Sequence, residues 1–278
     1  MRIVYLGTPP DAVPPLRALH DAGHAIALVV TQPDRKRGRG GAMVPSPVKV
    51  AAEELGLPVV TPERSREIVD TVRATGAELG VVVAFGQILP TPLLEALPLG
   101  FVNLHFSLLP RWRGAAPVER AILAGDAETG VDIMAIEAGL DTGPVFASAR
   151  TAIDPAETAG ELHDRLVAIG TDLLVRTVPE VPNIEPMPQA GEPTYAEKLT
   201  VDEFELDPDA PADDLDRIVR AGNPRPGAWM TYGGKRLKVW RGHVDGTRFV
   251  PDEVQPEGRR AMPYDAWLAG HHGAAPFG

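Results

Sequence analysis

The chain contains no cysteine, which excludes disulfides, a thiolate nucleophile and a zinc site built on cysteine sulfur. It lacks an apolar run long enough to cross a bilayer, and its first residues have the pattern of a strand and not of a secretory leader. Acidic residues outnumber basic ones, 38 to 27, and the formal charge of −11 argues against a protein that coats nucleic acid without selectivity. We therefore expect a cytoplasmic protein with no membrane partner.

The motifs of several enzyme classes are missing as well. Gly7 stands alone after the first expected strand, without the G-x-G-x-x-G spacing of dinucleotide-binding folds, and there is no G-x-x-x-x-G-K-[ST] phosphate loop. No H-E-x-x-H segment or carboxylate–histidine cluster has metal-ligand spacing, so we expect no metal. The chain also lacks the G-x-S-x-G elbow, which argues against a serine hydrolase.

What the sequence does contain is a regular alternation of short apolar runs and helical segments. The apolar runs at 2–6, 25–30, 79–84, 101–104, 131–136 and 144–149 predict strands. Helices are expected up to residue 22, at 115–124 and at 157–175, and also from Pro47 to residue 54 with Ser46 as the N-cap. This order predicts an α/β fold with a doubly wound, mostly parallel sheet, in which residues 79–84 form the central strand.

The composition changes after residue 178. Residues 179–200 begin with a stretch rich in Pro, Glu and Gln and predict a linker between a domain at 1–178 and a second domain at 201–278. In the second domain, a helix at 212–221 precedes strands at 228–232 and 237–240 joined by a Gly233-Gly234 turn. These short strands predict a small β-barrel, and the residues from 246 onward show no pattern that predicts an element.

The strand expected at 101–104 carries two polar side chains at its carboxyl end, Asn103 and His105, on one face. An amide donor beside an imidazole suits a point where negative charge develops on an oxygen. Asp141, in a Leu-Asp-Thr-Gly turn, is a candidate for the carboxylate that orients the imidazole. Each residue alone also fits a structural role, because such histidines commonly satisfy neighbouring polar groups and such aspartates bond to turn backbone.

Two basic clusters stand out in this acidic chain. One is a glycine-rich run with the cations Arg35, Lys36, Arg37 and Arg39. It is interpreted either as a solvated loop or as a flexible loop that enters a nucleic acid, with arginines for phosphates and base edges. The other lies on the expected hairpin and consists of Lys235, Arg236 and Lys238. Its cations at 236 and 238 share one face of a strand, opposite apolar neighbours, which fits a phosphate-backbone contact or an ordinary solvated strand.

A mostly apolar loop follows the expected central strand, comprising Phe85, Gly86, Gln87, Ile88 and Leu89. Because ligands of such sheets bind at the carboxyl ends of the strands, this loop is a candidate for holding a flat heterocycle. A plain connection between a strand and a helix explains it equally well.

Several of these motifs together resemble the methionyl-tRNA formyltransferases, over nearly the whole chain. The segment Ser-Leu-Leu-Pro-Arg-Trp-Arg-Gly-Ala-Ala-Pro at 107–117 is typical of formyltransferases that use 10-formyltetrahydrofolate. The basic run at 35–39 with Pro-Ser-Pro-Val-Lys at 45–49 is similar to the members of that group that act on tRNA. Gly-Thr-Pro at 7–9, Phe-Gly-Gln-Ile-Leu-Pro at 85–90 and Thr-Tyr-Ala-Glu-Lys at 194–198 match as well.

The resemblance implies transfer of a formyl group from 10-formyltetrahydrofolate, a co-substrate, to the amine of methionyl initiator tRNA, with no metal and with a monomeric enzyme. It implies that Asn103, His105 and Asp141 are the catalytic residues. Residues at 85–89 and the segment Ser107, Leu108, Leu109 and Pro110 are implied to bind the folate. The two basic clusters are implied to bind tRNA, with Arg39 at the mismatched end of the acceptor stem.

Three departures from the family pattern bear on these expectations. Phe106 stands where many relatives have glycine, and Arg225 replaces an expected aromatic residue. The C-terminal domain is shorter than usual, as if barrel strands after Trp240 were missing, which puts tRNA affinity in doubt. The runner-up is a formyltransferase that acts on a nucleotide-linked amino sugar, which would lack the basic loop. A binding protein without catalysis is a third alternative and would require damage to the catalytic trio.

Overall fold

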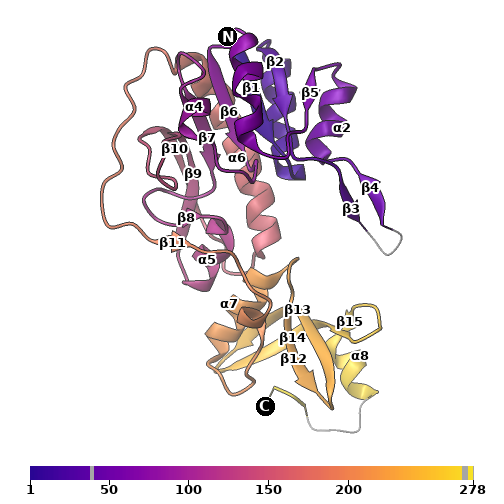
Figure 1. Ribbon diagram of the computed structural model, residues 1–278. Coiled ribbons are helices and arrows are strands. Elements are labelled where there is room, and N and C mark those ends of the chain that lie inside the picture. Colours follow the sequence, from indigo (N-terminus) through magenta and orange to yellow (C-terminus); the bar gives the residue numbers. More distant parts are fainter. Residues whose placement is uncertain (38–40, 271–274, 278) are drawn as a thin grey trace. The chain divides into compact units, whose positions relative to one another are not determined.

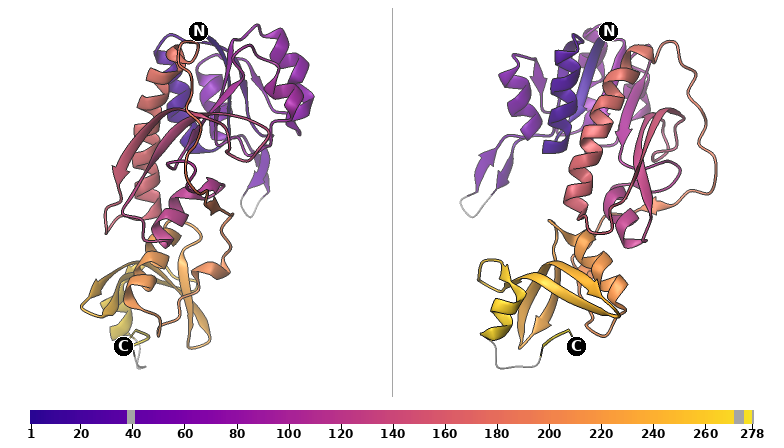
Figure 2. Two further views of the ribbon diagram at one scale, coloured as in Figure 1. Left: turned by 90° about the vertical axis from the view of Figure 1, so that its left-hand side faces the viewer. Right: turned by 180° about the vertical axis from the view of Figure 1, so that it is seen from behind.

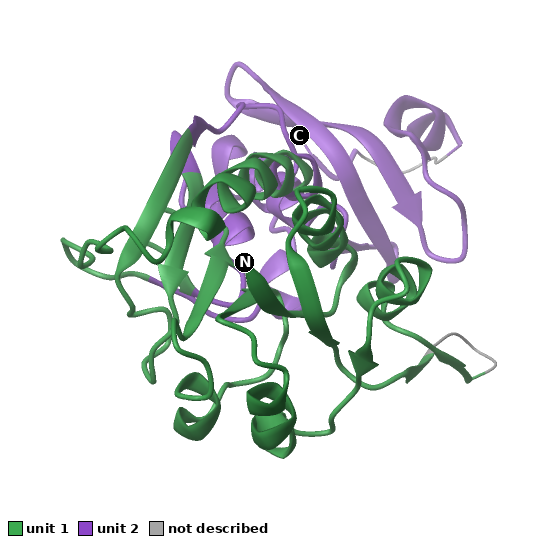
Figure 3. Ribbon diagram, turned by 90° about the horizontal axis from the view of Figure 1, so that it is seen from above, with its two compact units in different colours: residues 1–113, 130–150, 164–194 green, residues 114–129, 151–163, 195–278 purple. Residues whose placement is uncertain are grey.

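The computed structural model describes residues 1–37, 41–270 and 275–277. The chain divides into two compact units (Figure 3). Unit 1 comprises residues 1–113, 130–150 and 164–194, and unit 2 comprises residues 114–129, 151–163 and 195–278. The domain boundaries expected at 178 and 201 stay a prediction. No helix in the described part of the chain is long and apolar enough to span a membrane.

A seven-stranded sheet forms the centre of unit 1 (Figure 1). In spatial order its strands are β10 (Val145–Ala152), β9 (Glu128–Ala135), β7 (Phe101–His105), β6 (Leu79–Val83), β1 (Arg2–Gly7), β2 (Ala25–Val30) and β5 (Val59–Val60). The pairs from β7 through β6, β1 and β2 to β5 are parallel, and β9 pairs antiparallel with β7. The mostly parallel sheet and the central position of β6 are therefore confirmed.

Helices cover both faces of this sheet (Figure 3), as a doubly wound fold requires. One group comprises η1 (Pro10–Ala12), α1 (Val13–Asp21) and α2 (Pro47–Glu54), which contact one another. The other comprises η2 (Ser65–Ile68), α3 (Val69–Ala74) and α4 (Thr91–Leu94). The predicted cap of α2 is present, because the Ser46 hydroxyl accepts a hydrogen bond from the Lys49 N–H at 3.0 Å.

The central strand is buried at all five positions. Its Val82 side chain belongs to an apolar core that includes Leu6, Leu93 and Phe101. A Cβ added to Gly80 would lie 2.0 Å from the Phe101 ring, so only glycine leaves room for this ring against β6. This close packing fixes β7, and with it the residues at its carboxyl end.

The basic run after β2 is partly a hairpin and not the loop that we expected. Strand β3 (Arg35–Arg37) pairs antiparallel with β4 (Ala42–Val44). The backbone of these residues is held by its pairing with β4, in which Arg35 lies opposite Val44. Arg39 lies outside the described residues.

The long helix α6 (Ala159–Thr177) begins in unit 2 and ends in unit 1, and it is followed by η3 (Val178–Glu180). Residues 181–194 contain no helix or strand except for a single bridge at Met187. Two short strands, β8 (Arg113–Gly114) and β11 (Tyr195–Ala196), pair with each other, and α5 (Pro117–Leu123) follows β8. Figure 2 shows α6 and the irregular segment after it from two further sides.

Unit 2 is built on a four-stranded antiparallel sheet. Its strands are β12 (Ala228–Tyr232), β13 (Lys235–Asp245), β14 (Arg248–Pro256) and β15 (Met262–Pro263), in that order. Unit 2 also contains the helices η4 (Asp202–Phe204), α7 (Ala212–Gly222) and α8 (Tyr264–Ala269). Leu215 and Val219 of α7 and Trp267 of α8 pack into its core.

The expectation that strands after Trp240 are missing is wrong. Strand β13 continues to Asp245, and a turn at Gly246, with φ of 62°, reverses the chain into β14. Register shifts near Arg241 interrupt the alternation of buried and exposed residues, so the sequence lacks the regular two-residue period that would have predicted this strand.

Candidate active site

The carboxyl end of β7 and the loop after β9 bring His105 and Asp141 together within unit 1. The Nδ1 atom of His105 lies 3.9 Å from Oδ2 of Asp141. Both groups are sheltered from solvent, with side chains 6% and 18% exposed. The predicted approach of an imidazole and a carboxylate is therefore present, at the distance of an ion pair and longer than a hydrogen bond.

The other ring nitrogen of His105 is committed to the backbone. Nε2 lies 3.0 Å from the Trp112 carbonyl oxygen. A carbonyl only accepts hydrogen bonds, so we assign the hydrogen of a neutral ring to Nε2. Nδ1 is then the nitrogen that can accept a proton, and it accepts it next to Asp141.

Asn103 lies two residues before His105 on β7, so its side chain shares the histidine face of the strand. It is half-buried, and within residues 1–37, 41–270 and 275–277 its carboxamide has no hydrogen-bond partner. Because the residue is only half-buried, its amide hydrogens can reach a bound group that offers an acceptor oxygen. The amide is therefore suited to donate to a ligand.

Both residues that flank the His105 ring have left-handed backbones. Trp112 has φ of 62° and Asp141 has φ of 49°. For residues with a side chain this conformation costs on the order of 1–3 kcal/mol each, and it persists only where surrounding contacts enforce it. Strain of this kind is typical of functional sites, and here it occurs at the two neighbours of one histidine.

Asp132 is a site residue that we did not predict. It lies opposite His105 in the antiparallel pair of β7 and β9, so the two side chains share one face of the sheet. Its Oδ2 accepts a 2.7 Å hydrogen bond from the Leu109 N–H, and only 2% of the residue is exposed. Burial raises the pKa of the Asp132 carboxyl, against hydrogen bonds from Ser148 and Leu109 that lower it. A lone carboxylate in the apolar run Gly-Val-Asp-Ile-Met was a visible signal for such a site.

The loop after β7 carries the expected folate segment. Ser107 is fully buried and donates a 2.6 Å hydrogen bond to the Arg111 carbonyl, so it shapes the loop. Leu108, Leu109 and Pro110 are half-buried. Asp132 holds this segment through Leu109, next to the strand that carries His105. Phe106, the residue that replaces glycine in the family pattern, is buried, 8% exposed.

The loop after β6 contributes less ring surface than its sequence suggests. The Phe85 side chain is 2% exposed and packs into the core. Its carbonyl accepts hydrogen bonds of 2.9 Å from the Thr8 hydroxyl and the Gln32 carboxamide. Leu89 is also buried, whereas the Ile88 side chain is 89% exposed. Only the middle of the loop, residues 86–88, therefore faces solvent or a ligand.

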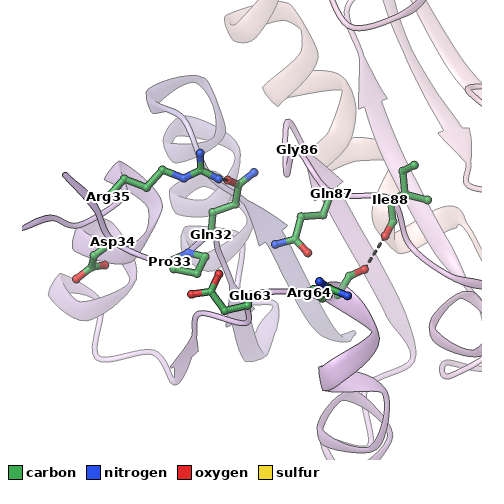
Figure 4. A pocket seen from close by; sticks show the side chains of 10 residues that line it. Gln32, Pro33, Asp34, Arg35, Glu63, Arg64, Gly86, Gln87 and Ile88 are labelled. Atoms are coloured by element: carbon green, nitrogen blue, oxygen red, sulfur yellow. Dashed lines mark hydrogen bonds between the residues drawn. The ribbon is translucent and has the colours of Figure 1, made fainter. Parts of the chain in front are cut away.

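This loop lines a cavity of about 430 Å³ at the carboxyl ends of parallel strands, where ligands of such sheets bind (Figure 4). Residues after β2, β5 and β6 form its walls: Gln32, Pro33, Asp34, Arg35, Glu63, Arg64, Ser65, Gly86, Gln87 and Ile88. The Arg35 guanidinium donates to the Gln32 carboxamide at 2.6 Å, and the Ser65 hydroxyl donates to the Ile88 carbonyl at 2.6 Å. The walls are mostly polar, so the cavity suits a polar group.

Within each of the two basic clusters, some side chains are held by contacts and others are exposed. Lys36 is exposed on β3. On β13, Lys235 is exposed, the Arg236 guanidinium stacks 3.8 Å from the centre of the Trp229 ring, and the Lys238 amine donates to the Pro226 carbonyl at 2.7 Å. Arg236 and Lys238 are therefore pre-positioned, which lowers the entropy lost when they bind an anion.

Comparison with known proteins gives two family matches. Residues 1–178 match the model described as formyl transferase, and residues 198–251 match the model described as formyl transferase, C-terminal domain. A methionyl-tRNA formyltransferase from Paracoccus denitrificans is 48% identical, with 97% of each chain covered.

Solved structures show the same fold at lower identity. A methionyl-tRNA formyltransferase from Clostridium thermocellum has a TM-score of 0.61 at 18% identity, covering 92% of this chain and 98% of that one. An N-formyltransferase from Helicobacter canadensis, solved with folinic acid and dTDP-3-aminofucose, has a TM-score of 0.65 at 16% identity, covering 94% and 98%. The fold alone does not distinguish formyltransferases that act on methionyl-tRNA from those that act on sugars, because both have similar TM-scores. The sequence similarity does distinguish them. The chain belongs to the formyl transferase family, among the methionyl-tRNA formyltransferases.

Proposed function

We propose that this protein transfers the formyl group of 10-formyltetrahydrofolate to the α-amine of methionyl initiator tRNA in the cytoplasm, giving N-formylmethionyl-tRNA. The observation that carries the proposal is the His105 ring, placed between the Asp141 carboxylate and the Trp112 carbonyl on a strand that also presents Asn103. Family membership supports the reaction type.

The reaction needs a donor for oxygen and an acceptor for a proton. The amine nitrogen attacks the formyl carbon, the carbonyl electrons move to oxygen, and a tetrahedral intermediate forms. Asn103, whose amide has no other partner in the described part of the chain, donates to this oxygen. His105 accepts the amine proton at Nδ1, where Asp141 stabilises the charge. Collapse of the intermediate then breaks the bond to the folate nitrogen, which takes up the proton that His105 had accepted.

The folate is expected along the two loops that follow β6 and β7. The accessible residues of the first loop are Gly86, Gln87 and Ile88, and those of the second are Leu108, Leu109 and Pro110. The hydrogen bond from Leu109 to Asp132 supports a fixed conformation of the second loop. A loop that is already ordered loses little entropy when a ligand binds.

The tRNA is expected on the cationic residues of the two hairpins. Arg35, Lys36 and Arg37 belong to the β3–β4 hairpin, and Arg39 follows them in the sequence. Lys235, Arg236 and Lys238 form one end of β13, where two of the three are held by aromatic or backbone contacts. The net charge of the whole chain is −11, so tRNA is repelled from most of the surface and its binding is expected only at these two clusters.

The test is formyl transfer from 10-formyltetrahydrofolate to charged initiator tRNA, with charged elongator methionine tRNA as the control. We expect rapid formylation of the initiator only, and Arg39→Ala should reduce the preference between the two tRNAs. Formylation of a nucleotide-linked amino sugar in preference to either tRNA would instead support the sugar enzyme. Equal binding of initiator and elongator tRNA across a salt series would also support the sugar enzyme.

A further inference from the structure

The irregular segment at residues 181–194 is hydrogen-bonded to other parts of unit 1 at Met187, Gln189 and Thr194, although its composition suggested a flexible linker. In Figure 1 it is the trace that leads from the end of α6 to β11. At Met187 it pairs with the start of β10, through two backbone hydrogen bonds of 2.8 and 2.9 Å with Val145. The segment therefore has a fixed register against the loop between β9 and β10, which carries Asp141.

Gln189 makes the most specific contacts of this segment. Its Nε2 donates hydrogen bonds of 2.8 Å to the carbonyls of both Asp141 and Gly143. Its Oε1 accepts from Nε and Nη2 of Arg113, at 3.0 and 2.6 Å. Two donors and two acceptor sites are all that a carboxamide offers, so every hydrogen-bonding position of Gln189 is used. The side chain joins the Asp141 loop to the residue that follows Trp112.

Thr194 holds the other neighbour of the His105 ring. Its hydroxyl accepts a 2.9 Å hydrogen bond from the Trp112 N–H, and its carbonyl accepts one of 2.9 Å from the Arg113 N–H. Its own N–H donates to the Pro110 carbonyl at 3.2 Å. The segment thus contacts both residues with left-handed backbones, Trp112 and Asp141, which lie against opposite nitrogens of the same imidazole.

We propose that residues 187–194 form a strap that positions the two groups facing His105, and that Gln189 is the positioning residue that holds Asp141 against Nδ1. The proposal rests on the proposed function. Gln189 contacts only the backbone of Asp141 in this arrangement, so it acts through the carboxylate and not on the substrate. Without its two donors, the loop around the left-handed Asp141 loses two hydrogen bonds that help to hold this conformation.

A positioning role predicts a specific kinetic signature. Loss of the Gln189 contacts should lower kcat, because the carboxylate moves away from the charge that forms on His105, and should leave KM for both substrates unchanged. A displacement of about 1 Å costs roughly 100-fold in rate, so Gln189→Met should lower kcat by roughly 10- to 100-fold. Gln189→Glu keeps acceptors for Arg113 but has no donor for the two carbonyls, and should lower kcat as much.

The effect should depend on Asp141. In single-turnover measurements, adding Gln189→Met to Asp141→Asn should change the rate by no more than about twofold, because the positioned charge is already absent. Glu192→Met is the matched control, since Glu192 is an exposed residue of the same segment. It should retain the wild-type kcat. Thermal unfolding of each variant checks that the fold is intact.

Amide hydrogen exchange gives a readout that does not require activity. Gln189→Met should speed exchange in peptides that cover residues 139–143 by roughly tenfold, while exchange in β6 stays as in the wild type. The proposal is overturned if exchange and kcat match those of Glu192→Met, if only KM for tRNA rises, or if the losses from Gln189→Met and Asp141→Asn multiply. Inactivity of the wild type toward methionyl-tRNA would overturn the proposed function, and the exchange result would still decide on the strap.

Discussion

Replacing Asp141 with asparagine removes one charge next to His105 and changes little else in size. At the observed separation of 3.9 Å, a carboxylate and an imidazolium attract each other by about 4 kcal/mol with the effective dielectric constant of about 20 that suits protein sites. The attraction is realised only after His105 has taken a proton, so it stabilises the transition state and not the free enzyme. About 4 kcal/mol corresponds to roughly a thousandfold in rate.

The assay is single-turnover formyl transfer to charged initiator tRNA, with enzyme in excess. We expect Asp141→Asn to lower the rate constant by roughly 100- to 1,000-fold, with the melting temperature within a few degrees of the wild type. Asp70→Asn, whose carboxylate is 98% exposed on the surface, is the control and should leave the rate unchanged. A rate for Asp141→Asn within about threefold of the control would refute the assignment, because no charge of this size would then act on the reaction.

Three further predictions concern stability. Burial raises the pKa of Asp132 in the folded protein above 3.8, so its ionisation opposes folding. The wild type should therefore lose stability relative to Asp132→Asn as the pH rises above about 4, and a constant difference between the two unfolding free energies in urea titrations would contradict this. Hydrogen bonds from Thr158, and a further one from Arg241, lower the pKa of Glu161 to about 2. Glu161→Gln should therefore lower the unfolding free energy by about 1 kcal/mol at neutral pH, and this loss should disappear as the pH falls from 4.5 toward 2. Ser46→Ala should lower the unfolding free energy by about 2 kcal/mol, because it removes the cap of α2 and the Ser46 hydroxyl that lies 2.6 Å from the buried Thr31 hydroxyl. A loss below about 0.5 kcal/mol would show that water replaces the Ser46 hydroxyl as the partner of Thr31.

The elements of unit 1 were predictable because local signals and packing agree there. Strand β2 has the predicted bounds, and α2 begins after the predicted cap. A strand that is buried on both faces of a parallel sheet needs a continuous apolar run, and β2 has one. In unit 2 the strands after Trp240 escaped prediction, because β14 alternates irregularly and contains Pro251 and Pro256, residues that ordinarily interrupt a strand.

For the candidate site, the sequence indicated residue types but not the contacts between segments far apart in the chain. Asn103 and His105 could be predicted as a pair, since strand geometry alone puts them on one face. The bond between His105 and the Trp112 carbonyl could not, because it depends on a left-handed residue in an irregular loop. Gln189 lies 48 residues after Asp141, and no local pattern connects them.

The two sides of the His105 ring are built in different ways, and this difference has a chemical reason. The ring itself is set by the register of β7 in the interior of a sheet, which cannot shift without disrupting the core. Asp141 instead belongs to a strained loop held by a few hydrogen bonds, 3.9 Å from Nδ1 and short of direct bonding. Because the hydrogen of the neutral ring is on Nε2, Nδ1 and the carboxylate are both acceptors and form no hydrogen bond in the ground state. Leaving it at ion-pair distance reserves most of the attraction for the moment when the imidazole becomes charged.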